Sequence, residues 1–235
     1  MQPSEWRDKL SETVREIFVS PELTDFFGTS ATPERSRLYL SQLSIYVRNR
    51  RNYWPQVAAN CPEFVVKQRI MGHEYEELVE DDYSDAGHLD LIFRQGKELG
   101  MTPEQILDSK ALPTTQACIY SWWWLARTRP WQEALAASTI AEWINDDRLL
   151  EDLGGGLVSH LRRNWQRDMD FKPKQMPNFT AHSAADEKHS EMFLDIFEKF
   201  VPKGGEAKII ATARESMQLH RVFFGGMAAE MARLT

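Results

Sequence analysis

The chain has little cysteine, no long apolar run and no excess of positive charge. Its two cysteines, Cys61 and Cys118, form no CxxC pair, which excludes a disulfide scaffold and a zinc ribbon and makes a reducing, cytoplasmic location the default expectation. The longest apolar run, residues 117–126, is too short to span a bilayer. A net charge of −7 argues against general nucleic-acid binding, which needs a basic face. We therefore expect neither a membrane nor a nucleic acid as a partner.

The sequence also lacks internal repeats, low-complexity tracts and linkers, so we predict a single domain over residues 1–235, with residues 1–30 as an N-terminal lead-in. The first residues, MQPSEWRDKLSETV, are amphipathic and acidic and have no apolar segment of the kind that a signal peptide needs. The glycines at 154–156 are not a phosphate-binding loop, because no strand precedes them and no Lys-Ser or Lys-Thr pair follows. They are typical of a helix end instead.

What the sequence does contain is helix punctuation. Thr32 and Thr102 are each followed by Pro and Glu, the pattern of a helix N-cap with proline in the first turn. No segment shows sustained alternation with β-branched residues, so no sheet is expected. The pattern predicts an all-α bundle of about seven core helices, because each amphipathic face needs a partner. The expected helices cover residues 4–18, 33–54, 62–99 with an interruption near 84–87, 103 onward, 113–127, 130–153, 157–169, 178–200 and 206 to the C-terminus.

One short motif carries metal-binding chemistry: His182, Asp186 and His189 stand at positions i, i+4 and i+7 of an expected helix. On a helix these positions lie within about 60° of one another, along one face. Two imidazoles and a carboxylate on one face are what a non-haem iron or manganese site needs. A solvated helix face produces the same spacing by chance, so the motif needs a second one to support it.

The second motif lies in the acidic segment of residues 73–88. Glu77, Asp81 and His88 would share one face if a single helix ran through the segment, although Gly87 argues for an interruption. So acidic a run is usually a solvated face. However, His88 opens an apolar-periodic stretch, which turns this helix inward. Buried carboxylates that face buried histidines need a cation between them, so the two motifs together predict a metal site.

The order of these motifs resembles the haem-oxygenase-like superfamily, which includes diiron oxidases and oxygenases, pyrroloquinoline-quinone synthase and thiaminase-II-like proteins. The similarity covers residues 35–202, and its most specific piece is FTAHSAADEKHSEMF. The resemblance implies a seven-helix bundle that binds iron ions rather than haem. It also implies that His182, Asp186 and His189 are ligands, and that Asp81 and His88 form the carboxylate–histidine pair seven residues apart.

The sequence departs from the diiron pattern in one place. Diiron members usually take one more glutamate from the first core helix, but residues 38–52 contain no acid. Glu77 or Glu142 would have to replace it. We accordingly expect Fe(II), two ions per chain, with O2 as co-substrate and with manganese as the other candidate metal.

Two further side chains are candidate catalytic residues. His160 occupies a place where the resembling family tends to direct a histidine toward the central cavity, and Tyr46 lies on the first core helix. His73 and His220 stand in no motif and are not assigned to the site.

The sequence predicts a non-haem iron oxidase or oxygenase that acts on a small biosynthetic molecule, such as an amino acid or an amino-acid-derived intermediate. One alternative is a cofactorless oxidase similar to pyrroloquinoline-quinone synthase, in which the histidines move protons. A second is a non-catalytic helical binding protein. A thiaminase-like cysteine nucleophile is disfavoured, because neither cysteine matches that subfamily. The resemblance also implies a homodimer, although nothing in the residues themselves indicates one.

Overall fold

The computed structural model of the chain describes residues 1–182 and 189–234. Over these residues all regular secondary structure is helical, and the short pairing of Asp81 with Ser84 is an isolated bridge rather than a strand. The α-helices are α1 (Pro3–Phe18), α2 (Pro21–Gly28), α3 (Pro33–Asn60), α4 (Phe64–Leu78), α5 (His88–Glu98), α6 (Pro103–Leu107), α7 (Pro113–Thr128), α8 (Trp131–Thr139), α9 (Leu157–Met169), α10 (Pro177–Glu191), α11 (Leu194–Phe200) and α12 (Glu206–Met231). Three 3₁₀ turns, η1 (Glu142–Asn145), η2 (Glu151–Leu153) and η3 (Pro173–Gln175), complete the chain.

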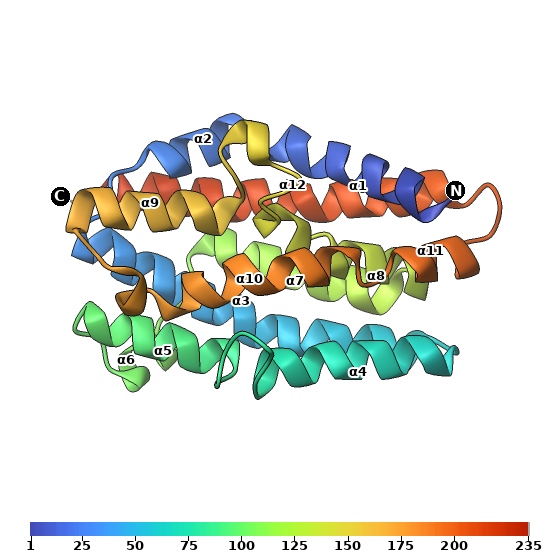
Figure 1. The fold of residues 1–235 in the computed structure, drawn as a ribbon, viewed down its shortest axis with the longest axis horizontal. Helices are drawn as coiled ribbons and strands as arrows, with labels where there is room; N and C mark the ends of the chain where they lie inside the picture. The colour runs from blue at the N-terminus through green and yellow to red at the C-terminus, as the bar shows by residue number, and fades with distance from the viewer. Residues whose placement is uncertain (235) are drawn as a thin grey trace.

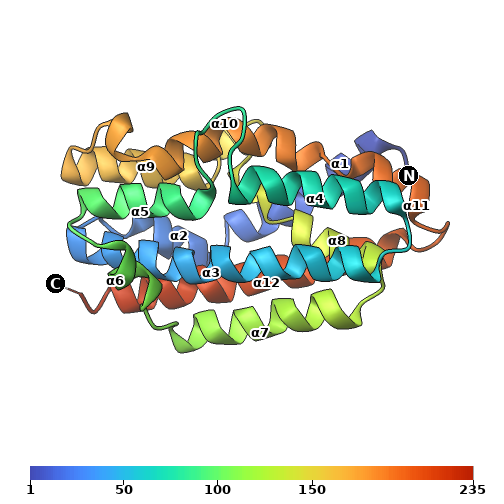
Figure 2. The same ribbon diagram turned by 90° about the horizontal axis from the view of Figure 1, so that it is seen from below.

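The long helices lie side by side along the long axis of the molecule (Figure 1). Helix α12 is central, because it packs against α1, α2, α7 and α8 and buries residues along its whole length. Helix α3 packs against α4, α5, α7 and α8, and α4 and α5 follow one another along one side of the bundle (Figure 2). Helix α10 contacts α5, α9 and η1. The predicted all-α bundle is therefore confirmed.

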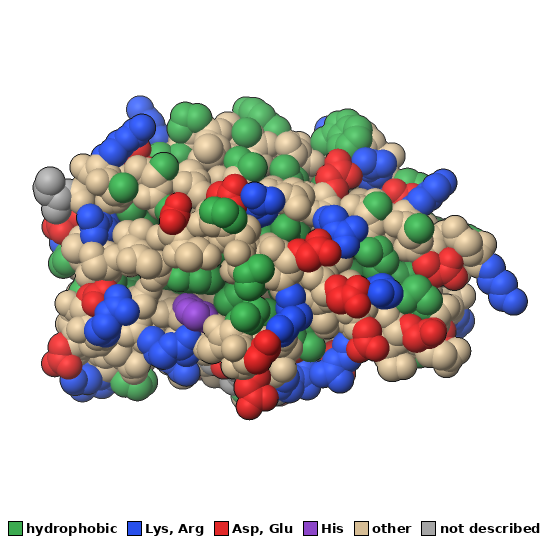
Figure 3. Space-filling model, turned by 90° about the horizontal axis from the view of Figure 1, so that it is seen from above, with side chains coloured by type: hydrophobic (Ala, Val, Ile, Leu, Met, Phe, Trp, Pro, Cys, Tyr) green, Lys and Arg blue, Asp and Glu red, His purple; other side chains and the backbone are tan. Residues whose placement is uncertain are grey.

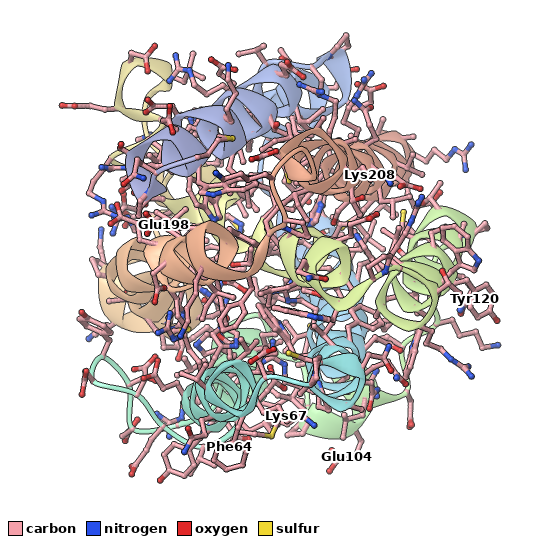
Figure 4. The ribbon with its side chains drawn as sticks, turned by 90° about the vertical axis from the view of Figure 1, so that its right-hand side faces the viewer. Phe64, Lys67, Glu104, Tyr120, Glu198 and Lys208 are labelled. Carbon is pink, nitrogen blue, oxygen red and sulfur yellow. The ribbon has the colours of Figure 1, made fainter. Side chains whose placement is uncertain are left out.

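The core of the bundle is strongly aromatic. Three tryptophans have no exposed surface: Trp6, Trp54 and Trp143. Burial of a smaller apolar side chain such as leucine stabilises a fold by about 1.5–3 kcal/mol, and a tryptophan buries a larger area. In the view along the helices, labelled side chains such as Phe64 and Tyr120 lie on the outside (Figure 4). Within the described part of the chain, no helix combines the length and the apolarity that crossing a membrane requires.

The expected helix over residues 62–99 is broken more widely than its sequence suggested. Helix α4 ends at Leu78 and α5 begins at His88. In the turn between them, the Asp81 carboxylate accepts hydrogen bonds from the backbone N–H groups of Tyr83 and Ser84 at 2.7 and 2.6 Å. A Cβ at Gly87 would lie 2.3 Å from the carbonyl oxygen of Leu78, so only glycine fits there. A continuous face of Glu77, Asp81 and His88 therefore does not exist.

Other helix ends also differ from expectation, for local reasons. Helix α3 continues through Pro55 to Asn60, because Trp54 and Val57 are buried there and offset the roughly 3 kcal/mol that an internal proline costs. The helix expected over 130–153 ends at Thr139. Beyond it, Asp147 accepts hydrogen bonds from the Gly156 N–H and the Ser159 hydroxyl, and such side-chain bonds compete with helix formation. The helix expected over 178–200 divides into α10 and α11, and the lead-in contains α2 as well as α1.

Candidate metal centre

Helix α4 contributes a histidine and a carboxylate to the interior from one face. His73 and Glu77 are one turn apart and are 1% and 5% exposed. The face turns inward because α4 packs against α3, where the Trp54 ring lies 4.7 Å from the His73 ring. The spacing of the two residues therefore places an imidazole and a carboxylate together in the core.

Two more elements complete a cluster of ligand-type side chains. Glu142 comes from η1 and His189 from α10, and both are buried. Together with the two residues of α4 they form a group that we call the central cluster: His73, Glu77, Glu142 and His189. One donor atom from each of these four residues lies within 4.8 Å of the donor atoms of the others.

The distances inside the central cluster are too long for hydrogen bonds. His73 Nε2 lies 3.9 Å from Glu77 Oε1 and 3.8 Å from Glu142 Oε1. His189 Nδ1 lies 3.8 Å from the same Glu77 oxygen. Donor atoms that each lie about 2 Å from a common first-row metal ion are separated by roughly 3–4 Å. The spacing therefore suits a metal ion better than it suits direct contacts.

Unsatisfied polar atoms support the same interpretation. His73 Nε2 and Glu77 Oε1 are buried, and neither has a hydrogen-bond partner among the described residues. A buried polar atom without a partner costs about 1–3 kcal/mol, and more if it is charged. A cation bound between these atoms would remove that cost, so the residues present fit a metal ion.

Both histidines of the central cluster have an outer carboxylate. His189 Nε2 lies 2.9 Å from Glu76 Oε2, and His73 Nδ1 lies 3.5 Å from Glu74 Oε1. Metal-binding histidines usually donate their second N–H to such a group, which sets the tautomer. His189 Nδ1 then presents its lone pair to the cluster, whereas His73 Nδ1 has no hydrogen-bond partner among the described residues.

The two carboxylates of the cluster are held ionised. Burial is the largest single effect and raises the pKa of Glu142, but the charges of Arg50, His73 and His189 together outweigh it and lower this pKa. Burial likewise opposes ionisation of Glu77, yet its contacts with His88 and Arg51 hold its pKa well below the ordinary value. The site is therefore anionic, as a cation-binding site requires.

A second pair of histidines adjoins Glu77. His88 Nδ1 lies 2.9 Å from Glu77 Oε2, and the rings of His88 and His182 are 4.2 Å apart. Asp81 Oδ2 lies 3.8 Å from the other nitrogen of His88. Asp81 thus approaches the far side of the His88 ring, away from Glu77.

The structure separates the sequence-predicted site residues into groups. It brings Glu77, Glu142 and His189 together and places His88 and His182 beside them, while Asp186 lies outside the described residues.

The predicted residue His160 lies away from this group. Its ring stacks on Phe27 at 4.5 Å and its Nε2 lies 3.1 Å from the Leu153 carbonyl oxygen. Sequence reasoning missed His73, whose i, i+4 spacing to Glu77 was the available signal.

A small cavity of about 60 Å³ adjoins the Glu77 and Glu142 side of the cluster. Its apolar wall comes from α3, η1, α9 and α12 and consists of Tyr39, Leu43, Val47, Ala141, Ile144, Leu157, Val158, Phe223 and Phe224. Tyr46 also lines it, donating to His220 Nε2 (3.1 Å) and accepting from Arg50 (2.9 Å). The direction of the first bond follows from His220 Nδ1, which donates to the Ser216 carbonyl oxygen.

The family model described as "Iron-containing redox enzyme" matches residues 37–221, a range that includes the whole central cluster. The chain belongs to this family of iron-containing redox enzymes. The family is named for iron, and the two histidines and two carboxylates of the central cluster could hold a metal ion. No curated protein sequence matches this family member.

Solved structures show that the fold of this family member is haem-oxygenase-like. A domain of unknown function with that fold from Shewanella denitrificans is 20% identical with a TM-score of 0.76, over 98% of this chain and 93% of that one. A CADD-like protein of unknown function from Nostoc punctiforme is 12% identical with a TM-score of 0.75, over 97% of both chains. A TenA homologue from P. horikoshii is 12% identical with a TM-score of 0.71, over 98% and 100%. At these identities the similarity establishes the fold alone.

Proposed function

We propose that this protein is a non-haem iron oxidase or oxygenase that uses O2 to oxidise a small molecule. The observation that carries the proposal is the central cluster, in which two buried histidines and two buried carboxylates lie at metal-ligand spacing. Two histidines with carboxylate oxygen and an open position are typical of non-haem Fe(II) sites that react with O2. His73, His189, Glu77 and Glu142 would hold the iron.

Bound iron would supply one-electron redox chemistry and the reduction of O2. The chain supplies the geometry. Glu76 holds the His189 ring and Trp54 packs on the His73 ring, so both imidazoles stay fixed. Arg50 holds Glu142 in place and offsets part of the negative charge. The apolar wall of the cavity keeps water away from the reacting groups.

The cavity supports a small substrate with an amino group. Asn145 and Asn178 line it, and the side-chain oxygen of each is buried without a hydrogen-bond partner among the described residues. Such acceptors suit an ammonium or amide donor, which agrees with an amino acid or a related intermediate. Tyr46 remains a candidate catalytic residue because it lines the cavity, whereas His160 does not.

The cofactorless alternative receives less support. A metal-free oxidase for acidic aromatic substrates needs arginines that are available to bind carboxylates. Arg50 already pairs with Glu142, and Arg51 pairs with Glu74 and Glu77. Their charges are therefore engaged inside the protein.

The test is the iron content after anaerobic reconstitution with ferrous iron. We expect iron in the native protein and its loss in both His73→Ala and His189→Ala, because each variant removes a ligand. His160→Ala is the matched control, since His160 lies outside the cluster and this variant should keep its iron. O2 consumption should then be screened with amino acids. Iron that persists in both ligand variants, or no iron in any preparation, would contradict the proposal.

A further inference from the structure

The two oxygens of Glu77 have different surroundings. Oε1 faces His73 and His189 across 3.9 and 3.8 Å, which leaves room for an ion. Oε2 is at hydrogen-bond distance from two nitrogens, 2.9 Å from His88 Nδ1 and 3.0 Å from Arg51 Nη1. One side of the carboxylate is therefore open at metal-ligand spacing, and the other side is closed.

Arg51 closes the second side from the first core helix. It lies on α3, within the segment where residues 38–52 offer no acid to a second ion. Its Nη1 also lies 3.1 Å from Glu74 Oε1, so one guanidinium nitrogen is shared by two carboxylates. The Arg51 side chain is only 11% exposed, and a guanidinium keeps its proton in proteins. It therefore contributes a permanent positive charge beside Glu77.

A second metal ion and this guanidinium would compete for the same place. An ion bound to Glu77 Oε2 would have to displace the Arg51 and His88 nitrogens that lie 3.0 and 2.9 Å from this oxygen. A carboxylate at this position of α3 would offer a second ion a ligand, whereas an arginine offers none and occupies the space beside Glu77 Oε2.

We propose that the centre holds one metal ion per chain, and that the Arg51 guanidinium takes the position beside Glu77 that a second ion would need. This inference rests on the proposed function, in which the central cluster binds iron. Arg51 and His88 then act as positioning residues: by holding Glu77 Oε2, they turn Oε1 toward the ion between His73 and His189. Arg51 thereby determines how many metal ions the centre contains.

The experiment measures bound metal by elemental analysis after equilibration with Fe(II) without oxygen, and in parallel with Mn(II). The native protein should hold one ion per chain, and its bound Mn(II) should give the six-line electron paramagnetic resonance signal of an isolated ion. Arg51→Met removes the guanidinium and its charge but keeps the apolar stem, so its metal content should rise toward two ions and the spectrum should show coupled Mn(II). Arg51→Lys keeps a positive charge and should stay at one.

Arg48→Ala is the matched control, because Arg48 lies on the same helix but bonds to the carbonyl oxygens of Ser44 and Leu107. It should hold one ion. Two ions in the native protein would overturn this inference and leave the proposed function standing, a result that does not depend on whether Arg51→Met folds. No ion in the native protein would overturn the proposed function itself. One ion in folded Arg51→Met would show that Arg51 does not exclude the second ion.

Discussion

At the scale of single residues, the centre depends on pairs in which one side chain fixes another. His189 reaches the central cluster through Nδ1 while Glu76 holds its Nε2, and Glu142 is held by Arg50. The outer partners contribute no ligand atom. They determine which nitrogen of a ring carries the proton and where a carboxylate points, and the affinity for a metal depends on both.

Glu76→Gln tests this dependence. The amide is a weaker acceptor for the His189 N–H, so the ring should be less basic and less well oriented. We expect the affinity for iron to fall by about 10- to 100-fold, as is usual when such an outer partner is lost. A competitive titration against a chelator measures it. Glu80→Gln is the control, because Glu80 is exposed and nearby in sequence, and it should bind as the native protein does. Equal affinities for both variants would exclude an orienting role for Glu76.

At the scale of elements, the site depends on where helices end. The turn between α4 and α5 brings His88 back to Glu77, and the 3₁₀ turn η1 directs Glu142 inward after α8 stops. Uninterrupted helices through these segments would carry the same side chains to different places. Glycine at 87 is therefore as important for the geometry as the ligands, since a Cβ there would meet the Leu78 carbonyl oxygen.

Gly87→Ala should destabilise the protein by about 1–3 kcal/mol, because the turn must move to admit the methyl group. Gly72→Ala provides a matched control within α4. A Cβ at Gly72 would meet no atom within 4 Å, so this change should be neutral or stabilise the helix by up to about 1 kcal/mol. Urea denaturation measures both. Equal free energies of unfolding for the two variants would contradict the close contact between residue 87 and the Leu78 carbonyl oxygen.

At the scale of the whole molecule, the bundle encloses polar groups in an aromatic interior and leaves mixed charges outside. Lys, Arg, Asp and Glu side chains are interspersed over the face seen from above (Figure 3). Inside, α12 carries His220 into contact with Tyr46 of α3 and Trp122 of α7. Three helices pack around the neutral imidazole of His220. Because protonation of this ring would place a charge among them, the stability of the whole fold depends on pH.

Burial lowers the pKa of His220 from 6.5 to about 4. Because the folded value lies below the unfolded one, the neutral ring stabilises the fold fully above about pH 6.5, and this contribution is lost as the pH falls toward 4. The loss amounts to at most about 3 kcal/mol. His220→Gln cannot gain a proton, so its urea midpoint should fall less between pH 7.5 and pH 4.5 than that of the native protein. An equal fall in both proteins would refute the assignment.

Sequence patterns were sufficient for the fold class and for part of the centre. Apolar periodicity and N-cap signals are local, so they located most helices, including α7, α9 and α12, within a few residues. Glu77 and His189 could be named in advance because carboxylates and histidines at helical spacing are conspicuous on faces that turn inward, whereas Glu142 was named only as a replacement for the glutamate missing from the first core helix. His73 went unassigned because its partners other than Glu77 come from distant elements.

The sequence by itself determined an all-helical chain with acids and histidines on inward faces, because helix propensity and amphipathic spacing act over a few residues. Only the tertiary structure decided which of these side chains converge. It brought His73 into the centre and left His160 outside the cavity. It also placed Arg51 beside Glu77. These outcomes depend on how α3, α4, α10 and η1 pack against one another, and packing between distant segments leaves no local pattern to read.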